Sequence, residues 1–171
     1  MNGEPAQAFT LWTRMGADPK LLRPALADLD LDGDDDLILS GSNVETRVAY
    51  YENVGGGNFA PRPDALQHVN ANLPGRDTFF GPGSLSVTFG RFRGPSFAPD
   101  LIIADGDSGQ IEVYRSRSRH FFPLDAADNP FHDVNWGRDV SVACADLDDD
   151  GNVDVLVASR STPGQLQHFE I

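Results

Sequence analysis

The sequence predicts an all-β protein made of small, four-stranded antiparallel sheets that are arranged around an axis as the blades of a β-propeller. Three observations support this fold class. Short runs of β-branched and aromatic residues are bounded by turn residues, and the chain holds 17 glycines and 12 prolines. An internal repeat recurs about every 60 residues. No segment of a dozen residues has helical periodicity with caps. Small repeated sheets joined by hairpins shield their strand edges best in a propeller.

The repeat is carried by two loops dense in aspartate. Residues 25–43, ALADLDLDGDDDLILSGSN, align with residues 143–161, ACADLDDDGNVDVLVASRS. The aspartates at 28, 30, 32 and 36 match those at 146, 148, 150 and 154, and the glycines at 33 and 151 match as well. A degraded third copy spans 86–109, where Asp100 matches Asp36 but Gly90 and Phe92 replace the first two aspartates.

Each copy also repeats a series of predicted strands. A short strand such as SVACA precedes the loop, and a Leu-, Ile- or Val-rich strand such as DLIIADG follows it. The next strands, RVAYYENV, QIEVYRS and QLQHFEI, alternate apolar and polar residues. The predicted units are residues 15–63 for the first blade, 64–125 for the second, and 126–171 for a third blade without its last strand. Residues 1–14 resemble that missing strand and are predicted to close a blade.

Three blades are too few for a ring, because propellers typically have four to eight. Either two chains form a head-to-tail homodimer of six blades, in which each amino-terminal strand completes the partner's last blade, or the chain belongs to a longer propeller. The balance of strands and the methionine at position 1 favour the homodimer.

The aspartate loops are predicted metal sites. Two carboxylates 5 Å apart repel by roughly 3 kcal/mol at an effective dielectric of 20, and a divalent cation among them reverses that sign. Oxygen ligands at alternate positions favour Ca²⁺, so we expect two calcium ions per chain. The first site would use Asp28, Asp30, Asp32, the carbonyl of Asp34, and Asp36. The second would use Asp146, Asp148, Asp150, the carbonyl of Asn152, and Asp154.

An EF-hand is excluded, since its glutamate at position 12 is replaced by Leu39 and Val157 within β-patterned runs. The pattern D-x-D-x-D-G-x-x-D-[LV], followed by an apolar strand and YYENVGGGNF, instead resembles the FG-GAP/VCBS repeat of integrin-α-type propellers. The resemblance implies structural calcium in the hairpin between the first two strands of a blade. The middle copy departs from it: Arg91 and Arg93 stand near ligand positions. We therefore expect no metal there, and hypothesise that an arginine pairs with Asp100.

Composition limits the partners and the redox chemistry. A net charge of −13 and a pI near 4.4 argue against nucleic acid or an anionic membrane as the main partner. No run is long enough to insert into a membrane, and the first residues do not read as a signal peptide. The compartment stays open, although the resemblance favours an extracellular or cell-surface location. The single cysteine, Cys144, lies in an apolar run that predicts a buried structural thiol.

Two kinds of segment could contact a ligand. The connections 70–83 and 128–139 each hold Gly-Arg-Asp with aromatic residues, which either pack between blades or contact a carbohydrate or protein ligand. Their candidate residues are Arg76, Phe79, Phe80, Trp136 and Arg138. The basic run YRSRSRH, 114–120, is either an exposed turn or a contact for an anion or acidic partner.

The function predicted from these features is a non-catalytic, calcium-stabilised binding or assembly module, with lectin-like carbohydrate binding as its more specific form. The alternative is an enzyme propeller of the polysaccharide lyase or dehydratase type, or a fragment of one. That alternative requires a cluster of titratable groups, which the sequence shows only within the aspartate loops.

Overall fold

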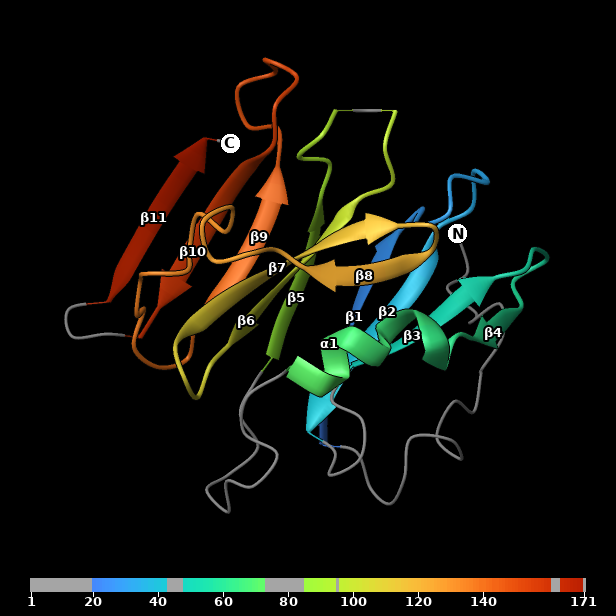
Figure 1. The fold of residues 1–171 in the computed structure, drawn as a ribbon, viewed down its shortest axis with the longest axis horizontal. Helices are drawn as coiled ribbons and strands as arrows, with labels where there is room; N and C mark the ends of the chain where they lie inside the picture. The colour runs from blue at the N-terminus through green and yellow to red at the C-terminus, as the bar shows by residue number, and fades with distance from the viewer. Residues whose placement is uncertain (1–19, 43–47, 73–84, 95, 161–163, 171) are drawn as a thin grey trace, which may run out of the picture.

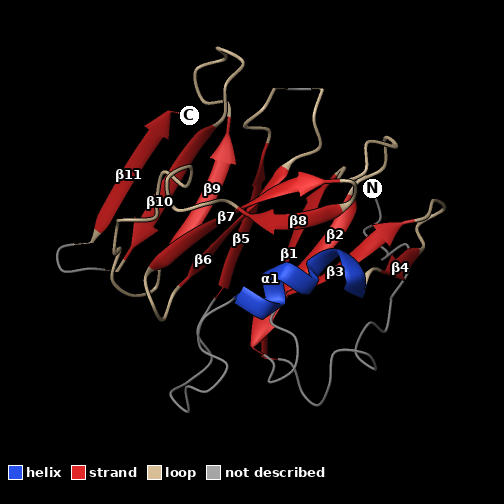
Figure 2. Ribbon diagram, in the orientation of Figure 1, coloured by secondary structure: helices blue, strands red, loops and turns tan. Residues whose placement is uncertain are grey.

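The computed structural model describes the chain except for residues 1–19, 43–47, 73–84, 95, 161–163 and 171. The described residues form eleven strands in three antiparallel sheets (Figures 1 and 2). The first sheet has the order β1 (Lys20–Ala27), β2 (Asp36–Ser42), β3 (Val48–Asn53), β4 (Phe59–Pro61). The second has the order β5 (Leu85–Gly90), β6 (Asp100–Asp105), β7 (Gln110–Arg117), β8 (His120–Pro123). The third consists of β9 (Ser141–Ala145), β10 (Asp154–Ser159) and β11 (Gln165–Glu170), with β10 in the middle.

The all-β class predicted from the sequence is therefore confirmed, and each sheet is built from hairpin neighbours along the chain. The described part does not close into a ring or barrel, so the propeller arrangement remains a proposal. A 3₁₀ turn (Pro63–Leu66) and a short helix, α1 (Gln67–Asn72), were not predicted; they connect the first two sheets. In the described part of the chain, no helix has the length and apolar character needed to cross a bilayer.

The central strand β6 divides the interior into two apolar cores. All six of its residues are buried, as expected for a strand covered on both faces. Leu101 and Ile103 face a core shared with the first sheet and α1, while Ile102 and Ala104 face a core shared with the third sheet. Each fully buried leucine or isoleucine contributes about 1.5–3 kcal/mol. The second sheet is thus held between the other two.

The first strands of the three sheets lie side by side. Strand β5 packs against β1 on one side and β9 on the other. Buried serines join the sheets: the Ser40 hydroxyl donates to the Leu85 carbonyl at 3.4 Å, and the Ser86 hydroxyl accepts the Val142 N–H at 3.1 Å. This packing fixes where the loops after β1, β5 and β9 leave their sheets.

The third sheet has one strand fewer than the others among the described residues. Strand β11 pairs with β10 along one edge only, and β10 pairs with β9 along its other edge. Residues 1–14, predicted to supply a fourth strand to a blade, lie outside the described part of the chain.

Replacing Ser86 with alanine tests the joint between the second and third sheets. The Ser86→Ala change removes the partner of the buried Val142 N–H, so we expect a loss of about 1–3 kcal/mol in the free energy of unfolding. Urea denaturation measures it, with the exposed Ser141→Ala as the matched control. Equal small losses for both variants would contradict this role of Ser86.

Candidate metal centres

The two predicted loops have the same conformation. They are called here the first aspartate loop (28–36) and the third aspartate loop (146–154), because the middle copy of the repeat lies between them. In the first, Asp28 accepts the N–H groups of Asp32 at 3.2 Å and Gly33 at 3.3 Å, and Asp32 accepts that of Asp34 at 3.0 Å. The corresponding bonds of the third loop join Asp146 to Asp150 (3.1 Å) and Gly151 (2.9 Å), and Asp150 to Asn152 (2.8 Å).

Backbone angles agree as well. Gly33 has a φ of 96° and Gly151 a φ of 89°, a left-handed conformation that glycine adopts without the strain of a side chain. Leu31 and Asp149, two residues earlier, also have positive φ, 65° and 60°. Two segments 118 positions apart therefore fold into one loop geometry, which is why the aspartate spacing recurs in register.

This geometry gathers carboxylates. One oxygen each from Asp28, Asp30 and Asp32 lies within 4.8 Å of the others, and the same holds for Asp146, Asp148 and Asp154. An additional group in the third loop is formed by Asp148, Asp150 and Glu170. A set of only oxygen donors on a flexible loop fits a hard cation, and Ca²⁺ more readily than the smaller Mg²⁺.

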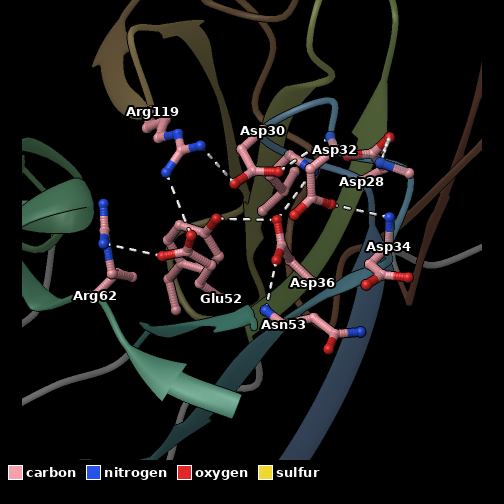
Figure 3. A network of polar contacts seen from close by, with 12 residues as sticks. Asp28, Asp30, Asp32, Asp34, Asp36, Glu52, Asn53, Arg62 and Arg119 are labelled. Carbon is pink, nitrogen blue, oxygen red and sulfur yellow. Dashed lines mark hydrogen bonds and ion pairs between the residues drawn. The ribbon is translucent and has the colours of Figure 1, made fainter. Parts of the chain in front are cut away.

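The last aspartate of each loop begins the second strand of its sheet and is buried. Asp36, 1% exposed, accepts the N–H groups of Leu29 (3.1 Å) and Asn53 (2.8 Å) and the hydroxyl of Tyr50 (2.9 Å) (Figure 3). Burial raises the pKa of the Asp36 carboxyl, and the three hydrogen bonds oppose that rise. One carboxylate thus ties the loop to the third strand of the sheet.

Asp154 has the same place in the third loop. It is 3% exposed, accepts the Leu147 N–H at 2.7 Å, and lies 2.6 Å from His168 Nε2. The Leu147 N–H and then His168 hold the pKa of the Asp154 carboxyl below its usual range. His168 pairs in register with Leu156 as Tyr50 does with Ile38, so the two polar side chains occupy equivalent positions.

The middle loop, 90–100, replaces the missing carboxylates with a guanidinium group. Arg93 Nη2 lies 2.8 Å from Asp100 Oδ1, and Arg93 Nε lies 3.4 Å from Oδ2. Asp100 is buried and also accepts the Ser116 N–H at 2.8 Å, the equivalent of the Asn53 bond to Asp36. The hypothesis that an arginine pairs with Asp100 is confirmed.

The first aspartate loop also receives an arginine from the second sheet. Arg119, in the turn between β7 and β8, contacts Asp30 Oδ2 at 3.0 Å and Glu52 at 3.3 Å, and Glu52 contacts Arg62 at 2.9 Å (Figure 3). The Asp30 side chain is 1% exposed. Burial raises its pKa, and the Arg119 guanidinium opposes that rise. The basic run of the sequence therefore meets an acidic partner within the chain.

The third loop lacks such a contact among the described residues. Asp148 and Asp150 are exposed, and Glu170, which follows Phe169 as Glu52 follows Tyr51, lies beside them instead of beside an arginine. The first loop is therefore partly neutralised by Arg119, whereas the third has no such arginine within the described part of the chain.

A cavity of about 520 Å³ opens between the two aspartate loops. Asp28 and Asp35 of the first loop, Asp146 of the third, and Arg91 of the middle loop line it. Its apolar lining includes Leu26, Phe89, Val153 and Cys144. Cys144 is half-buried, and burial raises the pKa of its thiol to about 11, which keeps the thiol protonated and poorly nucleophilic.

The remaining predicted residues are placed as follows. Asp34 and Asn152 are exposed in the loops, and the Asn152 amide donates to Asp150 at 2.8 Å. Trp136 is 3% exposed and packs edge-on against Phe169 in the second core. It therefore has a packing role and does not contact a ligand from the surface. Arg138 is exposed. Arg76, Phe79 and Phe80 lie outside the described residues.

Sequence reasoning missed Tyr50, His168 and Glu170. All three had a signal: each is a polar residue in the third strand of its repeat, at a position that the alignment of VAYYE with LQHFE could have placed beside the loop. The basic run that holds Arg119 was predicted as a possible contact for an acidic partner, but its contacts with Asp30 and Glu52 depend on how two sheets pack.

Comparison of the chain with protein-family models, with curated proteins and with solved structures finds no match in any of the three. The resemblance to FG-GAP/VCBS repeats therefore rests on the loop motif alone.

Removing the middle-loop arginine tests its role as a fixed counter-charge. Arg93→Met leaves the buried Asp100 carboxylate without its cation, and we expect a loss of about 3 kcal/mol in the free energy of unfolding. Adding Asp100→Asn should recover most of that loss, because no buried charge is then left unpaired. Chemical denaturation of both variants, with the exposed Arg138→Met as control, measures these effects. A double variant no more stable than Arg93→Met would refute the pairing.

Proposed function

We propose that this chain is a non-catalytic, calcium-stabilised β-propeller module that serves in binding or assembly. The observation that carries the proposal is the matched geometry of the two aspartate loops. Both hold three carboxylates close together in the same backbone conformation, whereas the middle loop, which lacks these carboxylates, supplies Arg93 to its remaining aspartate. In the middle loop, the chain itself supplies the positive charge beside the buried aspartate. In the two aspartate loops, a bound cation would supply it.

The residues that would hold calcium are Asp28, Asp30, Asp32 and Asp36 in the first loop, and Asp146, Asp148, Asp150 and Asp154 in the third. The carbonyls of Asp34 and Asn152 would add to these sets, and Glu170 could join the third. A bound ion supplies two positive charges to a hairpin that otherwise holds only repelling carboxylates. Its role would be structural, since Asp36 and Asp154 connect each loop to the strands of its sheet.

The binding role is supported by the cavity between the aspartate loops. Its lining combines an apolar floor with carboxylates and one arginine, the mixture typical of small-ligand sites. A carbohydrate or a polar protein segment would suit such a surface. Because Asp28 and Asp146 line the cavity, calcium bound in the two loops would order its walls.

The assembly role is supported by the unequal sheets. Sheets of four, four and three strands leave an open edge along β11 in the described part of the chain. An edge with unpaired backbone groups favours addition of another strand. We propose that a second copy supplies it and completes a six-bladed ring, with a longer propeller as the alternative.

Calcium dependence is tested by a pair of variants in one loop. Asp150→Asn removes a ligand from the third loop, and we expect its calcium affinity to fall at least tenfold by isothermal titration calorimetry. Asp149→Asn removes the same charge from a non-ligand position, where asparagine tolerates the positive φ, and should retain the affinity within about twofold.

The wild-type chain should also gain about 2.7 kcal/mol of stability for each bound calcium ion, at a calcium concentration of 100 times the dissociation constant of its site, and lose it with a chelator. No binding heat and no change in melting temperature with calcium would refute the calcium role.

Assembly is tested by light scattering at several concentrations. A homodimer predicts a mass near twice 18.5 kDa. A strictly monomeric chain would contradict the paired ring and leave the longer propeller.

A further inference from the structure

We infer that a second, separate cavity beside Arg115 and Arg117 binds a small ligand that carries a carboxylate on a hydroxylated ring, that is, a sugar acid. The inference specifies the ligand class of the proposed lectin-like function and rests on that form of it. The cavity has a volume of about 230 Å³ and shares no residue with the aspartate loops. Its lining consists of Arg115, Arg117, Phe122, Pro123, Leu124, Asp125 and Asp128.

Strand alternation places the two arginines on one face. Side chains at every second position of β7 point the same way, so Arg115 and Arg117 continue the face of Ile111 and Val113. Those two residues are buried against the third sheet. Beyond them the same face carries the side chains of Arg115 and Arg117. The Cα atoms of these two residues are about 6.6 Å apart, so both guanidinium groups can contact one ligand.

Neither guanidinium group has a carboxylate partner among the residues that the structure describes. Arg115 Nε is buried and has no hydrogen-bond acceptor, and within the described residues neither Arg115 nor Arg117 has an ion pair shorter than 4.0 Å. By contrast Arg62, Arg93 and Arg119 each contact a carboxylate. A buried charged donor without an acceptor is costly, so the lining calls for an acceptor from a ligand or from water.

The cavity is preformed. The chain after β8 is fixed to β7 by the Leu124 N–H, which donates to the Val113 carbonyl at 2.9 Å, and by the Asn129 amide, which donates to the Ile111 carbonyl at 3.1 Å. The Asn129 side chain also accepts the Phe131 N–H at 3.0 Å, and Phe131 is buried in the second core. Little ordering is therefore required of the protein when a ligand binds.

The chemistry of the lining selects the ligand. Two guanidinium groups suit a carboxylate, which they bind in a forked geometry. Asp125 and Asp128 would repel a bare inorganic anion but accept hydrogen bonds from hydroxyl groups. Phe122 is 37% exposed, pairs in register with Arg115 and packs against the His68 ring at 4.7 Å between centroids. The exposed part of its ring offers an apolar surface for a sugar. A sugar acid has all three features.

The test is a titration of the ¹⁵N-labelled, calcium-loaded chain with D-galacturonate, observed at the arginine Nε–H resonances. D-galactose, acetate and sulfate are the comparison ligands. We expect galacturonate to shift the Arg115 resonance and to bind at least tenfold more tightly than galactose or acetate. Arg117→Gln and Arg115→Lys should each weaken binding tenfold or more, while Arg160→Gln, at an exposed arginine outside the cavity, should leave it unchanged.

Three outcomes would overturn the site: equal binding of galactose, tighter binding of sulfate, or unchanged affinity in both cavity variants. Calcium binding is measured on the same samples to separate the two proposals. Loss of galacturonate binding with calcium binding intact rejects the sugar-acid site alone. Galacturonate binding to a chain that fails to bind calcium rejects the calcium role alone.

Discussion

Repulsion among carboxylates crowded into hairpin loops is the constraint on which the rest of this structure depends. Each sheet begins its second strand with a buried aspartate, Asp36, Asp100 or Asp154, and a buried carboxylate requires hydrogen bonds and positive charge nearby. The middle loop meets the requirement with Arg93. The first loop has Arg119 beside Asp30. For the first and third loops we propose a cation from solution.

This constraint links local chemistry to the packing of the sheets. Asp36 and Asp154 each accept a backbone N–H from their own loop, and Asp100 is held by Arg93 of its loop. Asp36 and Asp100 also accept an N–H from the third strand, so loop, second strand and third strand are fixed together. Arg119 extends the link across the interface, since it belongs to the second sheet and contacts the first. A change in charge at the first loop would thus alter the packing of the second sheet against the first.

Much of this organisation could be predicted because it is encoded locally. Alternating aspartates with a glycine define the loop, and apolar runs beside them define strands, so a loop from Asp28 between two strands could be predicted. The Arg93–Asp100 pair could be predicted from an arginine near a ligand position. Tyr50 and His168 could have been placed by aligning the third strands of the repeats, whereas the contacts of Arg119 and Trp136 depend on how sheets and a long connection pack, which a single sequence does not determine.

The most direct measurement of the central idea is a crystal structure of the chain grown with calcium, with anomalous scattering recorded. The account predicts anomalous peaks among the aspartates of the first and third loops and no peak beside Asp100, where the Arg93 guanidinium already lies. Loops without peaks at saturating calcium, or a peak beside Asp100, would contradict it.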